Sequence, residues 1–287
     1  MLKDKTFIVS ARFSGERLQN VLKQELGEAY SGKSIKQMID RYRCRVNGKI
    51  EKFSSYKVNR GDRIQLDLAQ EPVHEINRAL TILYEDDDLL IWDKPIQTVS
   101  DPTTLQALFA PQKVYLVHRL DKDTTGVMIL AKNTAMQKML EELFKKREIE
   151  KVYEAIVQGR APSEVFTVEN KIGKIAQYEG QAVWGKTSEG VYALTDFEVI
   201  KMTKNHLLVK CRPQTGRTHQ IRSHLAEMQL PILGDYHYAR TTVFQYPARR
   251  SLLHASSASF VHPKTQRQVT AIAPYPEDFR KALNELF

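Results

Sequence analysis

Apolar residues in the first quarter of the chain recur first at helical spacing and then at strand spacing. Helical spacing occurs at 18–26 and again at 35–42, which predicts two short amphipathic helices. Residues 46–50 place an Asn-Gly turn between apolar flanks, and 63–66 alternates between charged or polar and apolar positions. We expect a small α+β unit closed by a hairpin or small sheet.

Strand patterns predominate after residue 80. Two of them, 80–84 and 89–92, flank the acidic turn 85–88 and predict an antiparallel start. Alternation at 151–157 and an apolar segment at 207–213 predict two further strands. The three aspartates of the acidic turn lack the alternating spacing and the glycine of a calcium loop, so we interpret them as a solvated turn.

Two helical patterns lie among these strands. Residues 136–144 carry an apolar stripe that Asn133 or Thr134 is placed to cap. A second stripe at 221–228 follows a glycine turn, and Thr218 is its expected N-cap. Both stripes indicate helices that pack against a core and not cofactor sites.

Positive charge is concentrated at the N-terminal end. The net charge is +9, and residues 1–68 hold +7 of it, with 15 Lys and Arg against 8 Asp and Glu. A solvated basic surface is one interpretation, but gathered cations favour nucleic acid as a partner. Six cations surround the second predicted helix and the Asn-Gly turn, where they are placed to track a phosphate backbone: Lys33, Lys36, Arg41, Arg43, Arg45 and Lys49.

Length and composition indicate two folded units in a cytoplasmic protein. A chain of 287 residues with 42% hydrophobic content exceeds one average domain and can bury a sizeable core. It has no apolar stretch of membrane-spanning length, and residues 1–7 lack the apolar core of a signal peptide. Its two cysteines, Cys44 and Cys211, suggest neither a disulfide framework nor a zinc site.

The segment 118–126, with the sequence HRLDKDTTG, is the most informative part of the chain. It places a carboxylate, flanking cations and a turn glycine between the strand-like segments 114–117 and 127–131. Reactive groups tend to sit on loops that rigid strands hold in place. The pattern therefore points to chemistry at Asp121.

Two further residues stand in patterns that allow a structural or a chemical role. Arg222 falls in the first turns of a predicted helix, where its guanidinium suits a carboxylate such as Asp121. From the residues alone, an arginine solvated on the helix surface is the commoner outcome. Tyr153 lies in the strand 151–157, where a tyrosine is usually a core residue. His219 and His224 lack a metal-binding spacing.

Three ordered motifs resemble the RluA-type pseudouridine synthases. They are HRLDKDTTG at 118–126, KVYEAIVQG at 151–159 and TGRTHQIRSHLAEMQLPILGD at 215–235. The similarity runs from about residue 80 to the end of the chain. The chain departs from the family at Gln97 and Asp101, where glycine and histidine are frequent, and we interpret the departures as substrate tuning.

The N-terminal quarter resembles the small RNA-binding module first described in a small-subunit ribosomal protein. The motifs are RVNGK at 45–49 and GDRI at 61–64, and the match covers about 14–68. We therefore expect a basic RNA-binding module at 1–68, a linker at 69–79 and a catalytic domain at 80–287. Both units should be α+β, the larger with a mixed, mainly antiparallel sheet.

The resemblance implies that the protein isomerises specific uridines in RNA to pseudouridine. Asp121 matches the family's essential aspartate, which attacks the anomeric carbon of the sugar or abstracts a ribose proton, and both steps need an ionised carboxylate. Arg222 matches the basic residue that pairs with this aspartate and keeps it charged. Tyr153 matches a tyrosine that stacks on the base and helps to remove a proton from the new carbon–carbon linkage. No metal or organic cofactor is implied.

The resemblance also suggests residues that contact RNA. Arg119 matches a residue thought to fill the space left by an extruded nucleotide, since a uridine inside folded RNA must be flipped out to react. We expect further contacts from the third motif and from the basic module, namely Arg217, His219, Gln220, Lys33, Arg41, Arg43, Arg45 and Lys49.

Large-subunit ribosomal RNA is the favoured substrate, because this module accompanies the rRNA-modifying members of the family. A tRNA substrate is an open alternative. So is an RNA-binding ribosome-assembly factor without activity. A metal-dependent nuclease that uses Asp121 and Asp123 is a third. We expect a monomer.

Overall fold

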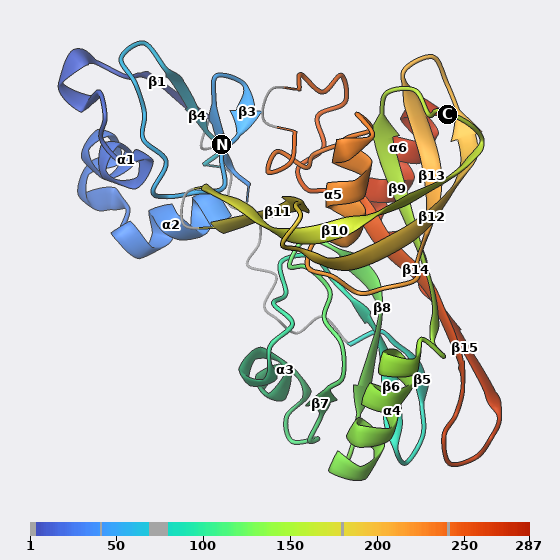
Figure 1. The fold of residues 1–287 in the computed structure, drawn as a ribbon. Helices are drawn as coiled ribbons and strands as arrows, with labels where there is room; N and C mark the ends of the chain where they lie inside the picture. The colour runs from blue at the N-terminus through green and yellow to red at the C-terminus, as the bar shows by residue number, and fades with distance from the viewer. Residues whose placement is uncertain (1–3, 41, 69–79, 179–180, 240–241) are drawn as a thin grey trace. The chain divides into compact units, whose positions relative to one another are not determined.

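The computed structural model describes residues 4–40, 42–68, 80–178, 181–239 and 242–287. By internal contacts the chain divides into two compact units, Met1–Glu75 with Gln177–Gln181, and Ile76–Ala176 with Ala182–Phe287 (Figure 1). The expected linker and Arg41 lie outside the described residues.

The N-terminal unit packs two helices against a four-stranded sheet. The strand order is β1-β4-β2-β3, and the described pairs are antiparallel. The elements are β1 (Lys5–Ile8), α1 (Leu18–Leu26), α2 (Gly32–Asp40), β2 (Cys44–Val46), β3 (Lys49–Ile50) and β4 (Arg63–Leu66), with two 3-10 turns at Ala11–Phe13 and Gly27–Ala29.

Both predicted helices and the hairpin of this unit are confirmed. The apolar stripes of α1 and α2 are buried in one cluster, with Leu18, Leu22, Ile35 and Ile39 all 0% exposed. Helix α2 ends earlier than the pattern predicts, because Tyr42 has a left-handed backbone (φ 62°) although its ring is buried. Strand β1 is an element that the sequence reasoning did not include.

The C-terminal unit contains an 11-stranded sheet with the order β11-β10-β12-β13-β9-β14-β8-β6-β5, with β15 on β14 and β7 on β8. The described pairings are antiparallel except β14 with β8, which is parallel. The expected mixed, mainly antiparallel sheet is therefore confirmed. The elements are β5 (Ile82–Glu85), β6 (Leu89–Lys94), α3 (Pro102–Phe109), β7 (Tyr115–Leu116), β8 (Thr125–Ala131), α4 (Thr134–Lys146), β9 (Glu150–Gln158), β10 (Val165–Tyr178), β11 (Gln181–Lys186), β12 (Val191–Met202), β13 (His206–Pro213), α5 (Gln220–Glu227), β14 (Leu253–Val261), β15 (Gln268–Ile272) and α6 (Glu277–Leu286).

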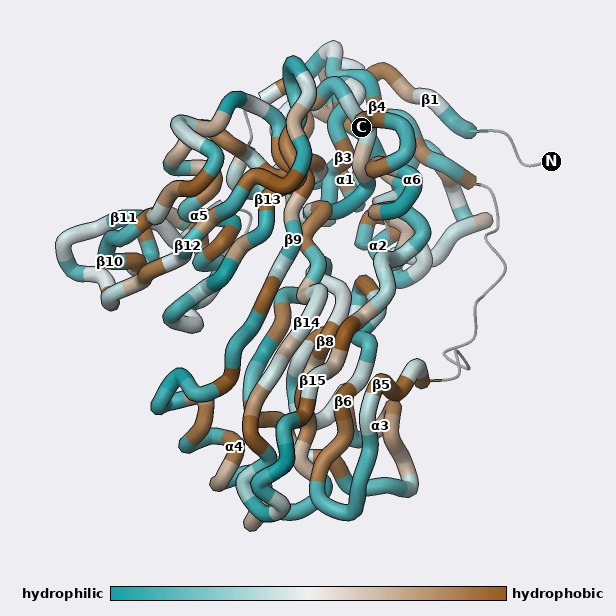
Figure 2. The backbone as a smooth tube through the Cα atoms, turned by 90° about the vertical axis from the view of Figure 1, so that its right-hand side faces the viewer, coloured by the Kyte–Doolittle hydropathy of each residue, from teal (hydrophilic) through white to brown (hydrophobic). Residues whose placement is uncertain are grey.

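Strand β8 lies between β14 and β6 in this sheet, and all seven of its residues are buried. Alternate residues enter two different core clusters, one with Met136 and Leu140 of α4, and the other with Leu105 and Phe109 of α3. Figure 2 shows hydrophobic stretches running along β6, β8 and β13. A strand enclosed on both faces is a rigid base for the loop that enters it, which is the loop of Asp121.

Of the two predicted N-terminal helix caps, one is confirmed and one is wrong. Asn133 caps α4 as predicted, because its side chain accepts a hydrogen bond from the amide of Met136 at 2.8 Å. The prediction of Thr218 as the cap of α5 is wrong. His219 is the N-cap residue, with a left-handed backbone (φ 56°) and no side-chain cap hydrogen bond, so α5 begins only at Gln220.

Gly126 of β8 provides a test of how tightly β8 and β14 pack. A Cβ there would lie 2.1 Å from the carbonyl oxygen of Ala255 on β14, and its φ of +107° disfavours any side chain. We expect Gly126→Ala to lower the free energy of unfolding by more than about 2 kcal/mol in urea titrations. Gly216→Ala, where a Cβ meets nothing within 4 Å, should stay within about 0.5 kcal/mol of the wild type. Equal midpoints for the two variants would contradict the described approach of β8 to β14.

Candidate active site

Asp121 projects from the loop between β7 and β8, as the sequence predicts. The backbone turns at this point, since the amide of Thr124 donates to the carbonyl of Asp121 at 3.0 Å. The Asp121 side chain is 29% exposed and so is open to an incoming molecule. Its loop therefore presents the carboxylate while β8 holds the far end in the core.

Groups from distant segments fix the carbonyl oxygens of this loop. Ser100 Oγ donates to Leu120 O at 2.8 Å, and the amide of Gln97 donates to Lys122 O at 2.8 Å. Arg250 Nη1 donates to Asp123 O at 3.0 Å. Because the backbone on both sides of Asp121 is held, its carboxylate has little freedom to turn away.

Lys94 lies beneath the same loop and is 0% exposed. Its Nζ donates to Thr124 O at 2.8 Å, to Pro95 O at 3.1 Å and to Lys122 O at 3.3 Å. Burial lowers the pKa of Lys94 to about 7, against the opposing effect of the Asp121 charge. Three carbonyl acceptors use all three protons of an ammonium group, so this geometry suits the charged form.

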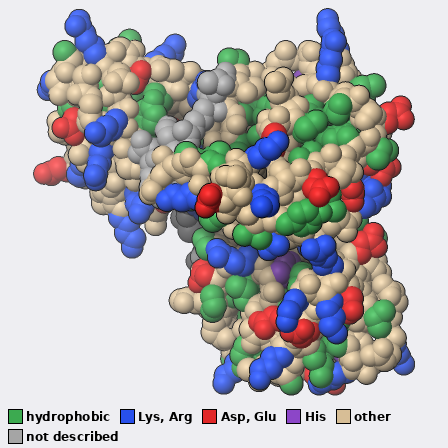
Figure 3. All heavy atoms as spheres, viewed as in Figure 1, with side chains coloured by type: hydrophobic (Ala, Val, Ile, Leu, Met, Phe, Trp, Pro, Cys, Tyr) green, Lys and Arg blue, Asp and Glu red, His purple; other side chains and the backbone are tan. Residues whose placement is uncertain are grey.

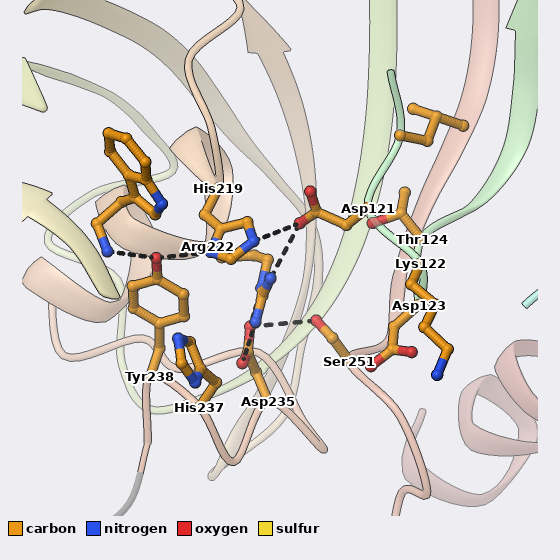
Figure 4. A network of polar contacts seen from close by, with 12 residues as sticks. Asp121, Lys122, Asp123, Thr124, His219, Arg222, Asp235, His237, Tyr238 and Ser251 are labelled. Atoms are coloured by element: carbon orange, nitrogen blue, oxygen red, sulfur yellow. Dashed lines mark hydrogen bonds and ion pairs between the residues drawn. The ribbon is translucent and has the colours of Figure 1, made fainter. Parts of the chain in front are cut away.

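The expected pairing of Arg222 with Asp121 is present, and a second carboxylate completes it (Figure 4). Arg222 Nη1 lies 3.0 Å from Asp121 Oδ2, while Nε and Nη2 bind Asp235 at 2.6 and 2.9 Å. Burial acts to lower the pKa of Arg222, but the charge and hydrogen bonds of Asp235, and then the charge of Asp121, raise it above its ordinary value. The bidentate pair with Asp235 therefore orients a permanent cation toward Asp121.

His219 approaches the same carboxylate oxygen. Its Nε2 lies 3.8 Å from Asp121 Oδ2, and its Nδ1 lies 2.9 Å from the hydroxyl of Tyr238. That hydroxyl already accepts the amide proton of Trp184 at 3.1 Å, so its own proton is available to Nδ1 and the ring proton is then on Nε2. Burial, and then the Arg222 charge, lower the pKa of His219 to about 4. At neutral pH the ring is uncharged and turns an N–H toward Asp121.

The two oxygens of Asp121 differ in environment. Arg222 and His219 both approach Oδ2. Among the residues that the structure describes, none is hydrogen-bonded to Oδ1. Oδ1 is therefore the oxygen left available for chemistry, while Oδ2 is the oxygen that is held.

Tyr153 lies on β9, opposite Cys211 of β13 and Ala255 of β14, and its ring is half-buried against two core clusters. Burial raises the pKa of Tyr153, and the charge of Asp121 adds to the effect. The phenol therefore stays protonated at neutral pH. It can offer a ring face and a hydroxyl proton, but it is a poor base without assistance.

The remaining residues expected near RNA have different surroundings. Arg119 is exposed beside Asp121 in sequence, and Arg217 is exposed with its Nε bound to Tyr192 O at 2.8 Å. Gln220 is buried, and its amide bonds to Thr215 Oγ1, the amide of Arg217, Leu194 O and Thr195 Oγ1. With every amide atom used inside the protein, Gln220 positions the loop before α5 and has no free atom for an RNA contact.

The described members of the basic cluster are mostly exposed, and Figure 3 shows Lys and Arg side chains on the surface of the N-terminal unit. Lys33 and Lys49 are exposed, and Arg45 is half-buried with Nη1 bound to Gly48 O at 3.1 Å. Arg43 differs, because its side chain is only 10% exposed and lies 3.7 Å from Asp67. Arg43 is thus the member of this cluster least able to reach a phosphate.

Three important residues were not recognised from sequence as parts of the site. Asp235, Lys94 and Arg250 are all nearly or fully buried. A buried charge needs partners, but burial is a property of the tertiary fold. The sequence alone does not distinguish a charged residue on the surface from one in the core. The third motif did include Asp235, at the end of its LGD sequence.

The described residues form neither a cluster of metal ligands nor a membrane-spanning helix. Within the described ranges no group of three or more His, Cys, Asp or Glu residues is arranged to hold a metal ion. In the acidic turn, Asp86 Oδ1 accepts the amides of Asp88 and Leu89, which is a turn-stabilising role. No helix in the described part of the chain is long and apolar enough to cross a membrane.

Comparisons with known proteins decide the family. A family model described as RNA pseudouridylate synthase matches residues 88–227, and an S4 domain model matches residues 16–64. Ribosomal large subunit pseudouridine synthase D of Haemophilus influenzae is 32% identical over 305 residues, covering 95% of this chain and 91% of that protein. The chain is an RluA-type RNA pseudouridine synthase. Its S4 domain is the expected RNA-binding module.

Other relatives of this synthase agree. The uncharacterized RNA pseudouridine synthase YlyB of Bacillus subtilis is 29% identical over 282 residues, covering 90% of each chain. Among solved structures, human RNA pseudouridylate synthase domain containing 4 is similar with a TM-score of 0.60 and 27% identity, over 71% of this chain and 92% of that one. The synthase fold and the family inferred from the motifs are both confirmed.

Removing the charge of Asp235 should destabilise the synthase, because Arg222 would be left with a single carboxylate. We expect Asp235→Asn to lower the free energy of unfolding by about 3 kcal/mol. Glu198→Gln breaks a comparable contact, with Arg212 at 2.9 Å, but both of those side chains are over a third exposed, so the loss should be below about 1 kcal/mol. Equal losses of unfolding free energy for the two variants in urea titrations would show that burial of the Arg222–Asp235 pair adds nothing to stability.

His118 should give the synthase a pH-dependent stability. Its Nε2 accepts the amide of Ile129 at 2.9 Å, and burial, with a smaller effect of the Lys151 charge, lowers its pKa from 6.5 to about 3. A depressed histidine pKa means that the unfolded chain binds the proton first, so stability is lost as pH falls from 6.5 toward 3. Relative to His118→Gln, the wild type should lose up to about 1.4 kcal/mol more per pH unit in this window. Parallel curves for the two proteins would contradict the assignment.

Proposed function

We propose that this synthase isomerises specific uridines of large-subunit ribosomal RNA to pseudouridine, with Asp121 as the reacting group. The observation that carries the proposal is the Asp121 carboxylate, held at Oδ2 by Arg222 at 3.0 Å and left open at Oδ1. The substrate follows from similarity to relatives named ribosomal large subunit pseudouridine synthase D, at 32% identity over nearly the whole chain. The S4 domain supports an RNA partner.

Asp121 Oδ1 would attack the anomeric carbon of the ribose or take a ribose proton. Both steps start from the ionised carboxylate, and the Arg222 cation stabilises that form. After the glycosidic bond breaks, the uracil must turn and rejoin through a ring carbon before it leaves. An Asp121 held by its backbone and by Arg222 stays in position during that rotation.

Tyr153 would support the uracil as a neutral phenol. Its raised pKa favours stacking over action as a free base, so proton removal from the ring carbon needs an additional acceptor in the complex. Arg119 is exposed two residues before Asp121 in the same loop, which suits insertion into the RNA after the uridine is flipped out. Lys33, Arg45 and Lys49 of the S4 domain would contribute phosphate contacts.

We infer that the protein acts as a monomer in the cytoplasm. Asp121, Tyr153 and Arg222 all come from one chain, so this site needs no second copy. Its ribosomal RNA substrate would be found in the same compartment.

The proposal is tested by mapping pseudouridine at single-nucleotide resolution after incubation with ribosomal RNA or tRNA in chelator. We expect product in large-subunit rRNA and RNA recovered uncut. Product only in tRNA would favour the tRNA alternative, and cleaved RNA would favour a nuclease. Tight binding without product would favour an assembly factor.

Asp121→Asn should lower the rate of product formation by at least about 1,000-fold, because it removes the reacting carboxylate. RNA affinity in filter binding should stay within about 3-fold of the wild type, since phosphate contacts supply most of it. Asp87→Asn makes the same chemical change at an exposed turn and should leave the rate unchanged. Equal losses of binding and turnover in Asp121→Asn would contradict the assigned role.

A further inference from the structure

A groove of about 510 Å³ lies beside the active site, between strands β10 and β11 and helix α5. Residues of both strands form one wall, among them Ile175 and Trp184, and Ser223 and Ala226 of α5 form the other. Tyr238 also lines the groove. Its volume is in the range of small-molecule sites.

Small residues contribute to both walls of the groove. Gly185 lies against Ile175, and a Cβ there would come within 2.5 Å of Ile175 Cδ1. On the helix side, Ser223 and Ala226 are three residues apart and so share a face. The aromatic ring of Trp184, half-buried, is the largest flat surface in the lining.

The charges at the rim disfavour a phosphate inside the groove. Lys186 lies 3.1 Å from Glu227 Oε1, and Glu227 Oε2 accepts a hydrogen bond from Asn170 at 2.6 Å. The cation of the lining is therefore paired with a carboxylate, and a phosphate would meet that carboxylate as well. An uncharged, flat group fits the groove better.

One polar group of the wall is available to such an occupant. Ser223 is 5% exposed, and among the described residues its hydroxyl has no hydrogen-bond partner. A hydroxyl can donate to or accept from the edge of a heterocycle. An aromatic face beside a free hydroxyl is the arrangement that binds unstacked bases of single-stranded RNA.

The groove is continuous with the catalytic centre through Tyr238. The amide of Trp184 donates to the Tyr238 hydroxyl at 3.1 Å, and that hydroxyl lies 2.9 Å from His219 Nδ1. The ring of Tyr238 also lies 4.9 Å from the guanidinium carbon of Arg222. A group stacked on Trp184 is thus one residue away from the pair that holds Asp121.

We propose that this groove binds the base of a nucleotide adjacent to the target uridine, with the Trp184 indole as its stacking surface and Ser223 reading its edge. The inference rests on the proposed function and adds the recognition of a flanking base. It makes Trp184 a specificity-determining residue, because it selects RNA that can unstack a base next to the target.

Intrinsic fluorescence tests the groove without turnover. The chain has two tryptophans, and Trp92 is only 1% exposed, so a change on RNA addition reports Trp184. We expect quenching when a single-stranded RNA of about 12 nucleotides saturates Asp121→Asn protein. Saturation in filter binding with unchanged fluorescence would overturn the proposal, whether or not the enzyme is active on rRNA.

Kinetics test the occupant on the RNA that the wild type modifies. Trp184→Ala should raise KM on the order of 10-fold with little change in kcat, and Trp184→Phe, which keeps a stacking ring, should restore most of the affinity. An abasic nucleotide at one position next to the target should raise the KM of the wild type by a similar factor. The same abasic nucleotide should not raise the KM of Trp184→Ala any further.

Failures of the two proposals are distinguishable. A wild type that forms no pseudouridine contradicts the proposed function, and the fluorescence result still decides the groove. If the wild type is active, the groove is tested by combining each abasic nucleotide with Trp184→Ala. If the fold-increases in KM from the two changes multiply at every flanking position, the changes act independently and the proposed groove is contradicted.

Discussion

The candidate active site depends on one arginine shared between two carboxylates. Arg222 gives two of its nitrogens to the nearly buried Asp235 and a third to the more exposed Asp121. The buried partner, Asp235, fixes the direction of the guanidinium, and the guanidinium in turn holds the exposed partner, Asp121. Since a buried cation with one carboxylate would be poorly compensated, the stability of this unit and the placement of the Asp121 carboxylate depend on the same arginine.

The rest of the C-terminal unit serves that geometry by holding the backbone around Asp121. Strand β8, enclosed on both faces, fixes where the loop ends. The Lys94 ammonium, the Ser100 hydroxyl and the Arg250 guanidinium then bind carbonyl oxygens on either side of the aspartate. Hydrogen bonds to carbonyls constrain the chain without touching the Asp121 carboxylate, so the backbone of the loop is held while this side chain stays 29% exposed.

Periodicity and motif order were sufficient to predict much of this. The helices α1, α2 and α4, the hairpin at Asn47 and the strands β9 and β13 follow from patterns that local sequence carries. The pair of Asp121 with Arg222 followed from motif resemblance. The start of α5 was missed because Gln220 organises the preceding loop by contacts with β12, and Asp235 was missed because its burial is a result of the fold. Strands β10 and β12 were not predicted, because charged residues interrupt the apolar positions in their sequences.

The loop carrying Asp121 also has a consequence for when the protein can act. Arg222 follows Asp121 by 101 residues, and Arg250, which binds the carbonyl of Asp123, follows that residue by 127 and is itself bound to Asp278 on α6. A ribosome must therefore finish and release nearly the whole catalytic unit before the aspartate acquires its partners. During synthesis the S4 domain therefore emerges before the surroundings of Asp121 can be assembled.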